Sequence, residues 1–248
     1  MDFTCYSAEL RLKAPYAVSF APFTAANLIR GQFGKDLFHR DHQLYEKLFK
    51  PMPRDQAPSG FLNPPRPFVL RTSNLDGKSF AKGEDLRFRI NLFDPSFREC
   101  FPSTVWRENV MSIPSGSSSG RVRIDFLTPT EFKESSRPEF GVLFARLRDR
   151  ISGLRKMYGP GPLEIDFKAI GERSRKVEMI ECETTYASIT RRSRATGQSH
   201  PLSGFIGHAV YEGEIGEFLP YLYIGKDVGV GRQTVWGKGE IETQVVKS

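Results

Sequence analysis

The chain has 248 residues, which is enough for one large domain or two small ones, and either arrangement buries a hydrophobic core. Its 36 lysines and arginines exceed its 29 aspartates and glutamates, so the net charge of +7 favours an anionic partner, with nucleic acid as the leading candidate. The N-terminus lacks a basic, apolar leader, and no stretch approaches the ~18 apolar residues of a membrane span. We therefore expect a cytoplasmic protein with no membrane partner.

The three cysteines are far apart in the sequence. Cys5, Cys100 and Cys182 form no C-x-x-C pair and no Cys/His cluster with the spacing of zinc ligands. An odd, sparse set of cysteines also suits a reducing compartment better than a disulfide framework. We expect three free thiols, no metal and no cofactor.

The N-terminal part predicts a strand followed by a helix. Leu10 and Leu12 alternate with charged residues, which predicts a strand within residues 3–20. Apolar residues then recur at three- and four-residue spacing, which predicts a helix over about 25–38 with Thr24 as its N-cap.

Two of the four histidines follow this helix, close to a tyrosine and two lysines: His39, His42, Tyr45, Lys47 and Lys50. Histidine can take or give a proton near neutral pH, and lysine or tyrosine can orient a phosphate or stabilise its charge. These types suit metal-free RNA cleavage, in which a 2′-hydroxyl loses a proton and a leaving 5′-oxygen gains one. Equally, both histidines could simply occupy the exposed end of a helix.

The proline-rich stretch from Pro51 to Pro67 predicts a loop, and strands are expected at 68–72 and 85–93. In the second of these strands Arg87 and Arg89 lie on the face opposite the apolar residues. That row could line an RNA path, although charged residues on a solvent face are also ordinary for an antiparallel sheet.

Residues 95–120 have an irregular pattern that ends in a Ser/Gly-rich stretch at 115–120, typical of a flexible linker. We place the domain boundary there, with an N-terminal domain at 1–114 and a C-terminal domain at 121–248. A shortened first domain or an engineered replacement of a loop would both produce this pattern.

The second half repeats the order of a strand, at 121–127, and a helix, at about 138–156. This order in both halves suggests two α+β units of ferredoxin-like type. The densest basic stretch follows, and Arg191, Arg192 and Arg194 could hold phosphates by charge-assisted hydrogen bonds or could form a mobile hairpin tip.

A glycine-rich stretch at 229–239 precedes a predicted final strand. Glycine is used where the backbone takes positive φ or approaches another group closely, so this stretch predicts a shaped loop that a phosphate can approach. A tight glycine hairpin with incidental charges is the alternative. Seven residues of the loop are candidates for RNA binding: Gly229, Gly231, Arg232, Trp236, Gly237, Lys238 and Gly239.

Two G-x-G pairs separated by five residues before a final strand resemble the C-terminal signature of the CRISPR repeat-processing endoribonucleases of the RAMP superfamily. Residues 203–213 and 218–222 resemble the strand and helix that precede that loop in the family. Residues 28–37 and 64–70 resemble recurring pieces of its N-terminal part, so the resemblance spans most of the chain.

The resemblance implies two tandem ferredoxin-like (RRM-like) domains, the first abbreviated. It also implies metal-independent cleavage of CRISPR precursor RNA within its repeats, in which a 2′-hydroxyl attacks its own phosphate and leaves a 2′,3′-cyclic phosphate and a 5′-hydroxyl. We rank His42 and then His39 as catalytic candidates, with Tyr45, Lys47 and Lys50 orienting groups or stabilising charge. Where family members often carry a catalytic tyrosine on the first helix, the positional match falls near Arg30.

The implied partners are the repeat RNA or crRNA and other CRISPR-associated effector subunits, with the protein a monomer or a homodimer. A non-catalytic RAMP subunit that only holds crRNA is the main alternative. A basic two-domain protein that binds unrelated RNA ranks last, because it would make the order of motifs a coincidence.

Overall fold

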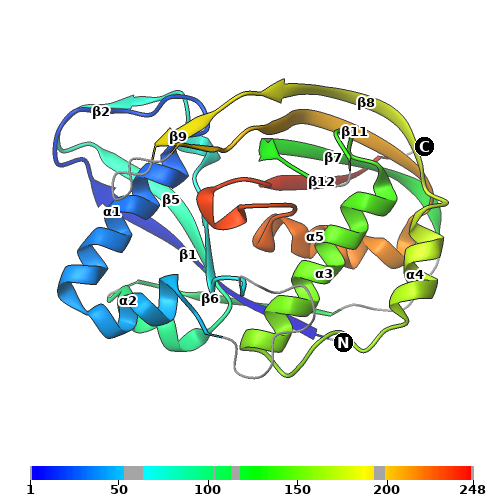
Figure 1. Ribbon diagram of the computed structural model, residues 1–248, viewed down its shortest axis with the longest axis horizontal. Helices are drawn as coiled ribbons and strands as arrows, with labels where there is room; N and C mark the ends of the chain where they lie inside the picture. The colour runs from blue at the N-terminus through cyan, green and yellow to red at the C-terminus, as the bar shows by residue number, and fades with distance from the viewer. Residues whose placement is uncertain are drawn as a thin grey trace.

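The computed structural model describes residues 2–52, 64–102, 104–112, 118–133, 135–192 and 199–246, without the side chains of residues 191, 192, 199 and 200. Two four-stranded antiparallel sheets form the framework, and α1 and α2 lie at one end of the molecule while α4 lies at the other (Figure 1). Within the described residues, no helix is both long and apolar enough to cross a membrane.

The first sheet has the strand order β3-β5-β1-β6. Strands β2 and β4 pair with each other and form a separate two-stranded ribbon. The elements of this first unit are β1 (Asp2–Lys13), β2 (Val18–Ser19), α1 (Ala25–Arg40), α2 (His42–Phe49), β3 (Phe68–Arg71), η1 (Ser73–Leu75), β4 (Ser79–Phe80), β5 (Asp85–Leu92), η2 (Pro95–Cys100) and β6 (Arg107–Ser112).

The second sheet has the strand order β12-β7-β11-β8, and the short strands β9 and β10 form a separate hairpin. The elements of this second unit are β7 (Ser119–Thr130), α3 (Phe140–Tyr158), α4 (Phe167–Ser174), β8 (Glu178–Ala187), β9 (Thr190–Arg192), β10 (Ser199–Pro201), β11 (Gly204–Glu214), η3 (Gly216–Phe218), α5 (Leu219–Val228), η4 (Thr234–Trp236) and β12 (Ile241–Val246).

Both units follow the strand-helix-strand-strand-helix-strand order of the ferredoxin-like fold, which confirms the predicted fold class. The first unit is abbreviated at its second helix, where the six residues of η2 form a 3-10 helix instead of an α-helix. The expectation of irregular structure throughout 95–120 was wrong for β6, which pairs with β1 at the edge of the sheet. Residues of β6 are exposed or half-buried throughout, so its sequence shows no apolar alternation.

Residues 115–117 of the predicted linker lie outside the described residues, while 119 and 120 already belong to β7. The domain limits 1–114 and 121–248 therefore stay a prediction. Most of the predicted proline-rich loop, at 53–63, also lies outside the described part of the chain.

The N-terminus of α1 is capped from another segment. The Thr24 hydroxyl, predicted as the cap, donates instead to the carbonyl oxygen of Ala21 at 2.7 Å. The backbone N–H of Ala25 donates to Asp76 Oδ1 at 2.9 Å. The cap therefore ties α1 to the loop after η1.

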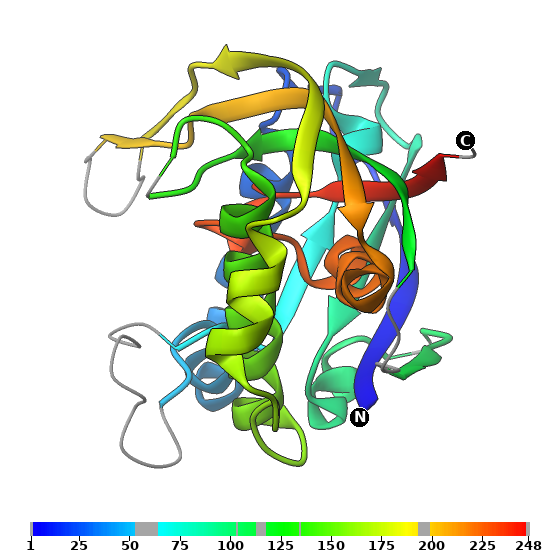
Figure 2. The same cartoon turned by 90° about the vertical axis from the view of Figure 1, so that its right-hand side faces the viewer.

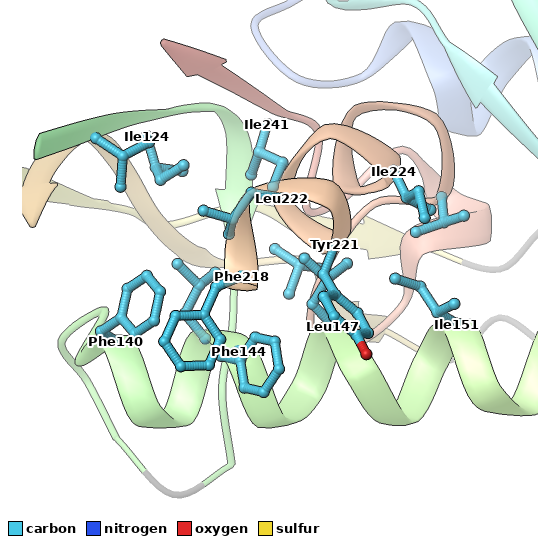
Figure 3. Packing of buried hydrophobic residues seen from close by; sticks show 14 of the residues in the cluster. Ile124, Phe140, Phe144, Leu147, Ile151, Phe218, Tyr221, Leu222, Ile224 and Ile241 are labelled. Carbon is cyan, nitrogen blue, oxygen red and sulfur yellow. The ribbon is translucent and has the colours of Figure 1, made fainter. Parts of the chain in front are cut away.

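The helices α3 and α5 cover one face of the second sheet, as Figures 1 and 2 show. Figure 3 shows the aromatic and aliphatic side chains that fill the space between them, among them Phe144, Phe218 and Tyr221. Phe144 and Phe218 have no exposed surface, and their ring centroids lie 4.7 Å apart in an edge-to-face arrangement.

The first sheet has two different faces. Leu70, Phe88 and Ile90 lie in the core that the sheet forms with α1 and α2. We call the opposite face the seam face. Register and alternation assign to it residues that include Phe3, Cys5, Ser7, Glu9, Arg11, Val69, Arg71, Arg87, Arg89, Asn91 and Phe93.

Part of the seam face is covered by the second unit. Phe3, Cys5, Val69 and Phe93 belong to the same buried cluster as the core of the second sheet. Beside them, Asn91 Nδ2 donates to the carbonyl oxygen of Asp227 at 2.9 Å. The two units therefore share one continuous core.

Replacing Phe144 with alanine should lower the free energy of unfolding by about 3–5 kcal/mol, because it opens a cavity in a fully buried aromatic cluster. Urea denaturation followed by circular dichroism measures the change. Val245→Ala, at a half-exposed position on β12, is the control and should change stability by less than about 0.5 kcal/mol. Equal effects of the two substitutions would contradict the assignment of this core.

Candidate nucleic-acid interface

The loop from Gly229 to Gly239 has a backbone that only glycine accommodates easily. Its four motif glycines all have positive φ, from 69° at Gly239 to 84° at Gly237. A Cβ at Gly239 would lie 1.8 Å from the carbonyl oxygen of Val230, and one at Gly237 would lie 2.1 Å from Cβ of Ala26. The glycines therefore let the loop close on itself and let α1 approach it.

Hydrogen bonds hold the loop closed and tie it to the end of β7. The N–H of Val230 donates to the carbonyl oxygen of Gly239 at 2.9 Å, and the N–H of Gly239 donates to that of Pro129 at 3.1 Å. The N–H of Arg232 donates to the carbonyl oxygen of Glu131 at 3.2 Å. The loop is thus anchored at both ends and in the middle.

Lys238, a predicted RNA contact, points into the protein. Its side chain is 2% exposed, and its ammonium donates to Glu131 Oε2 at 2.7 Å, the carbonyl oxygen of Ser203 at 2.7 Å and Gln233 Oε1 at 3.1 Å. These three acceptors take all three donors of a lysine. Lys238 therefore supports the loop from within and has no donor left for a ligand.

Arg232 is the loop cation that faces solvent. Its Nη1 lies 2.8 Å from Glu131 Oε1, and its side chain remains 59% exposed. Burial alone would raise the pKa of Glu131, but Lys238 and Arg232 outweigh it and hold that pKa below its usual value. Of the two predicted cationic donors in the loop, Arg232 is the one that a phosphate could reach.

Trp236, predicted to offer a stacking surface, already has a partner. The guanidinium of Arg30 lies 3.5 Å from the centroid of the Trp236 ring and 5.0 Å from that of Phe49. This cation–π contact joins the loop to α1 and α2. Arg30 thus occupies the place on the first helix where the family resemblance puts a tyrosine.

The predicted catalytic segment lies at the junction of α1 and α2. The ring centroid of Phe38 is 5.7 Å from that of His39, 4.6 Å from that of His42 and 5.2 Å from that of Tyr45. The rings of His42 and Tyr45 stack at 6.3 Å. The structure therefore brings both predicted histidines and the tyrosine around one phenylalanine.

Three charged side chains surround this aromatic cluster. Lys50 Nζ and His42 Nε2 lie 2.8 and 3.8 Å from Glu46 Oε1, and the hydrogen bond that Lys50 donates to Glu46 raises the pKa of Lys50. Lys47 is exposed on the same helix. The side chain of His42 is 58% exposed, so a substrate can reach it.

The histidines and the glycine loop lie toward opposite ends of α1. The loop touches α1 at Ala26, and His39 follows thirteen residues later, which corresponds to roughly 20 Å at ~1.5 Å per helical residue. The two predicted functional regions are therefore separated along α1, although Arg30 links Trp236 of the loop to Phe49, whose ring stacks on that of Tyr45 at 4.9 Å.

The predicted basic stretch is described only in part. Arg194 and the side chains of Arg191 and Arg192 lie outside the described residues, although the backbone of β9 pairs with β10. The role of these arginines stays a prediction.

One group of side chains has the composition of a metal site. Among the described residues, Glu181, Glu183 and His208 have ligand atoms within 4.8 Å of one another, on strands β8 and β11. His208 Nε2 lies 2.6 Å from Glu181 Oε1, so a hydrogen bond between these two side chains accounts for the arrangement. These residues belong to the second sheet and take no part in the loop or the histidine cluster.

Glu131 and Arg30 were not among the predicted site residues. Glu131 is 107 positions from Lys238 in sequence, and no local pattern connects them. The sequence did point to Arg30, because the positional match for the family's catalytic tyrosine falls near it. Its contact with Trp236, however, depends on the tertiary fold and could not be predicted.

Gly239→Ala should destabilise the protein by more than about 2 kcal/mol, because it combines a positive φ with a clash against backbone. Gly31→Ala is the matched control: a Cβ there meets nothing within 4 Å on α1, so it should stabilise by up to about 1 kcal/mol. Thermal and urea unfolding of both variants measure these effects. A mild effect of Gly239→Ala would show that the loop is not built as described.

Glu131→Gln should lower the free energy of unfolding near neutral pH by about 1–3 kcal/mol, because Lys238 and Arg232 lose a charged acceptor. The folded pKa of Glu131 lies below its ordinary 4.5, so its contribution is present above that pH and is lost as the pH falls through the folded value. The stability difference between wild type and variant should therefore shrink from pH 7 to about pH 3. A difference independent of pH would contradict the ion-pair assignment.

Two protein-family models match this chain, one in each half. A family model described as CRISPR-associated endoribonuclease Cas6 matches residues 124–241, and a second model, described as an N-terminal domain, matches residues 2–125. No curated protein matches the chain closely in sequence.

Solved structures share the fold over nearly the whole chain. A Cas6 product complex has a TM-score of 0.62 and 17% identity, covering 97% of this chain and 99% of that one. Thermus thermophilus Cas6 has a TM-score of 0.58 and 18% identity, with coverage of 98% and 99%. A Cas6 substrate mimic complex has a TM-score of 0.53 and 16% identity, with coverage of 98% and 100%.

The family match covers the segment from β7 to the start of β12, including the glycine loop, and the shared fold extends through the first unit. The chain is thus similar to the Cas6 endoribonuclease family over residues 124–241 and shares the Cas6 fold along nearly its whole length.

Proposed function

We propose that this protein cuts CRISPR precursor RNA within its repeats, without a metal ion, to give crRNA. The observation that carries the proposal is the grouping of His39, His42 and Tyr45 at one end of α1, whose other end packs on the glycine loop of the family. The similar Cas6 structures include complexes with a product and with a substrate mimic, which supports repeat RNA as the ligand.

The proposed reaction uses the RNA's own 2′-oxygen as nucleophile. His42 takes the 2′-hydroxyl proton, and the oxygen attacks the adjacent phosphorus while the bond to the 5′-oxygen breaks. The products are a 2′,3′-cyclic phosphate and a 5′-hydroxyl, and the leaving oxygen needs one proton. We assign this role to His39, whose ring centroid lies 5.7 Å from that of Phe38.

The lysines supply positive charge near this centre. Lys50 stays protonated across the working pH range, since its contact with Glu46 raises its pKa. Lys47 is exposed one turn earlier on α2. Both can stabilise charge on the phosphate as it becomes five-coordinate, and Tyr45 can orient His42 by ring stacking.

A crRNA-holding subunit without catalytic activity is the second candidate. It is favoured by the separation of the loop from the histidines along α1 and by the presence of Arg30 near the position of the family's tyrosine. In that case the loop and basic residues bind RNA, and His39 and His42 are surface residues.

A cleavage assay in excess chelator decides between the two, with the cognate repeat RNA and a matched RNA carrying a 2′-deoxy substitution at the cut site. Wild type should cut only the unmodified RNA, and His42→Ala should slow single-turnover cleavage by roughly 10²–10⁴-fold with little change in affinity. His208→Ala, a histidine of the second sheet paired with Glu181, is the control and should cut at the wild-type rate.

Tight binding of the repeat by wild type with no cleavage would establish the non-catalytic function. Cleavage that survives in His42→Ala but disappears in His39→Ala would reverse the proposed order of the two histidines.

A further inference from the structure

Two arginines face each other on the seam face of the first sheet without an acceptor for their protons. Arg71 of β3 is directly opposite Arg89 of β5 in the antiparallel register. Arg71 is 3% exposed, and its three nitrogen atoms, together with Nε of Arg89, are buried and hydrogen-bond to none of the described residues. Like charges directly opposite each other destabilise a sheet, and buried guanidinium groups normally have partners.

Three carboxylates are near the pair, and one of them, Glu9 of β1, is exposed and directly opposite Arg89 in the register. The other two accept hydrogen bonds from other residues. Asp227 Oδ1 accepts from Asn91 Nδ2 at 3.3 Å, and Glu240 Oε1 accepts from Ser73 Oγ at 2.9 Å. Burial lowers the pKa of Arg71, and the attraction of Glu240 and Asp227 only partly offsets it. The two carboxylates therefore reduce the cost of the buried charge but supply no hydrogen bonds to it.

A third arginine and a lysine add positive charge around the pair. Burial lowers the pKa of Arg150, and the charge of nearby Arg71 lowers it further. Nε of Arg150 donates to the carbonyl oxygen of Val228 at 2.7 Å. Lys226 is exposed at the same end of α5. With Glu9 opposite Arg89, four cations face three carboxylates, which leaves one net positive charge.

The pair borders open space. Arg71 and Arg89 lie at one part of an extended hollow with a volume of about 2700 Å³, whose lining also includes Glu9 of β1 and Phe38 and Tyr45 of the first two helices. The second unit covers the other part of the seam face, whereas here Arg87 is exposed, Arg89 is half-buried and Arg71 is buried. Gly229 adjoins the pair, since a Cβ at that glycine would lie 3.3 Å from Arg71 Nη2.

We propose that Arg71 and Arg89 form a phosphate-binding site on the seam face, and that its occupant is a backbone phosphate of the RNA. The inference rests on the proposed function in taking RNA as the ligand. The two non-bridging oxygens of a phosphodiester can accept hydrogen bonds from two guanidinium groups at once. A phosphate between the arginines replaces their repulsion with attraction to a shared anion.

This site differs from the histidine cluster in position and in role. Arg71 and Arg89 lie on the face of the first sheet opposite α1 and α2. Contacts with phosphate fix the position of the RNA without reading its bases. The pair therefore contributes affinity along the backbone, away from the bond that is cut.

Binding of 2′-deoxy-substituted repeat RNA, followed by fluorescence anisotropy over a range of salt concentrations, tests the site in Arg89→Met and Arg71→Met. Each variant should bind about 10–100-fold more weakly at low salt, as expected for lost hydrogen bonds to a charged group. The slope of log affinity against log salt should fall by about 0.7 for one lost contact with a single strand. Arg173→Gln, an exposed arginine of α4 paired with Glu217, is the control and should bind within about twofold of wild type.

Stability without RNA separates binding from a structural role. Arg71→Met should fold with equal or higher stability, because it removes a buried charge that lacks a partner. Wild-type affinity and salt slope in both methionine variants would overturn the proposal. If Arg71→Met lowers the unfolding midpoint instead, Arg89→Met alone decides.

Inorganic phosphate provides a test that does not depend on RNA cleavage. At matched ionic strength, phosphate should raise the unfolding midpoint of wild type and Arg173→Gln more than that of Arg89→Met. An equal rise in all three would overturn the site. If wild type neither binds nor cuts repeat RNA but still shows this difference, the proposed function fails while the anion site remains.

Discussion

The relative position of the two units depends on one shared hydrophobic core. Four side chains on the seam face of the first sheet pack into the cluster that α3 and α5 form with the second sheet: Phe3, Cys5, Val69 and Phe93. Because both units contribute to this cluster, one cannot rotate against the other without exposing buried apolar surface. That constraint sets the end of the second unit, where the glycine loop lies, against α1 of the first.

The glycine loop is formed before any RNA arrives. Its four glycines satisfy backbone geometry, and Glu131 holds Lys238 and Arg232 from the end of β7. A loop already fixed by internal bonds loses little further conformational freedom on binding. Because Lys238, one of the two cations of the loop, is bound inside the protein, most of the positive charge that attracts RNA has to come from other surfaces.

The sequence predicted the two ferredoxin-like units and the position of the loop because these depend on local signals. Apolar alternation gave β5, spacing of three and four residues gave α1 and α3, and paired glycines marked positive φ. Strand β6 was missed since an exposed edge strand needs no apolar face. The direction of the Lys238 side chain could not be predicted either, because its acceptors come from distant parts of the chain.

The orientation of the Arg71 side chain could not be predicted from the sequence either. Residues 68–71 are all buried, and a strand buried on both faces gives no periodicity from which the orientation of one arginine can be read. Only the register with β5 reveals that Arg71 and Arg89 oppose each other. A charged residue inside a short buried strand was nevertheless a signal, because buried charges require partners.

The position of β3 gives the loop a geometric role. β3 is an edge strand of the first sheet, and the loop contacts both sides of that edge: Gly229 adjoins Arg71 on the seam face, while Trp236 stacks on Arg30 of α1. The path around this edge, along the loop, is one by which an RNA strand could touch both the arginine pair and the histidine cluster. The unit that carries the proposed catalytic residues and the unit that carries the glycine loop then act on one strand, and neither of them contains the whole path.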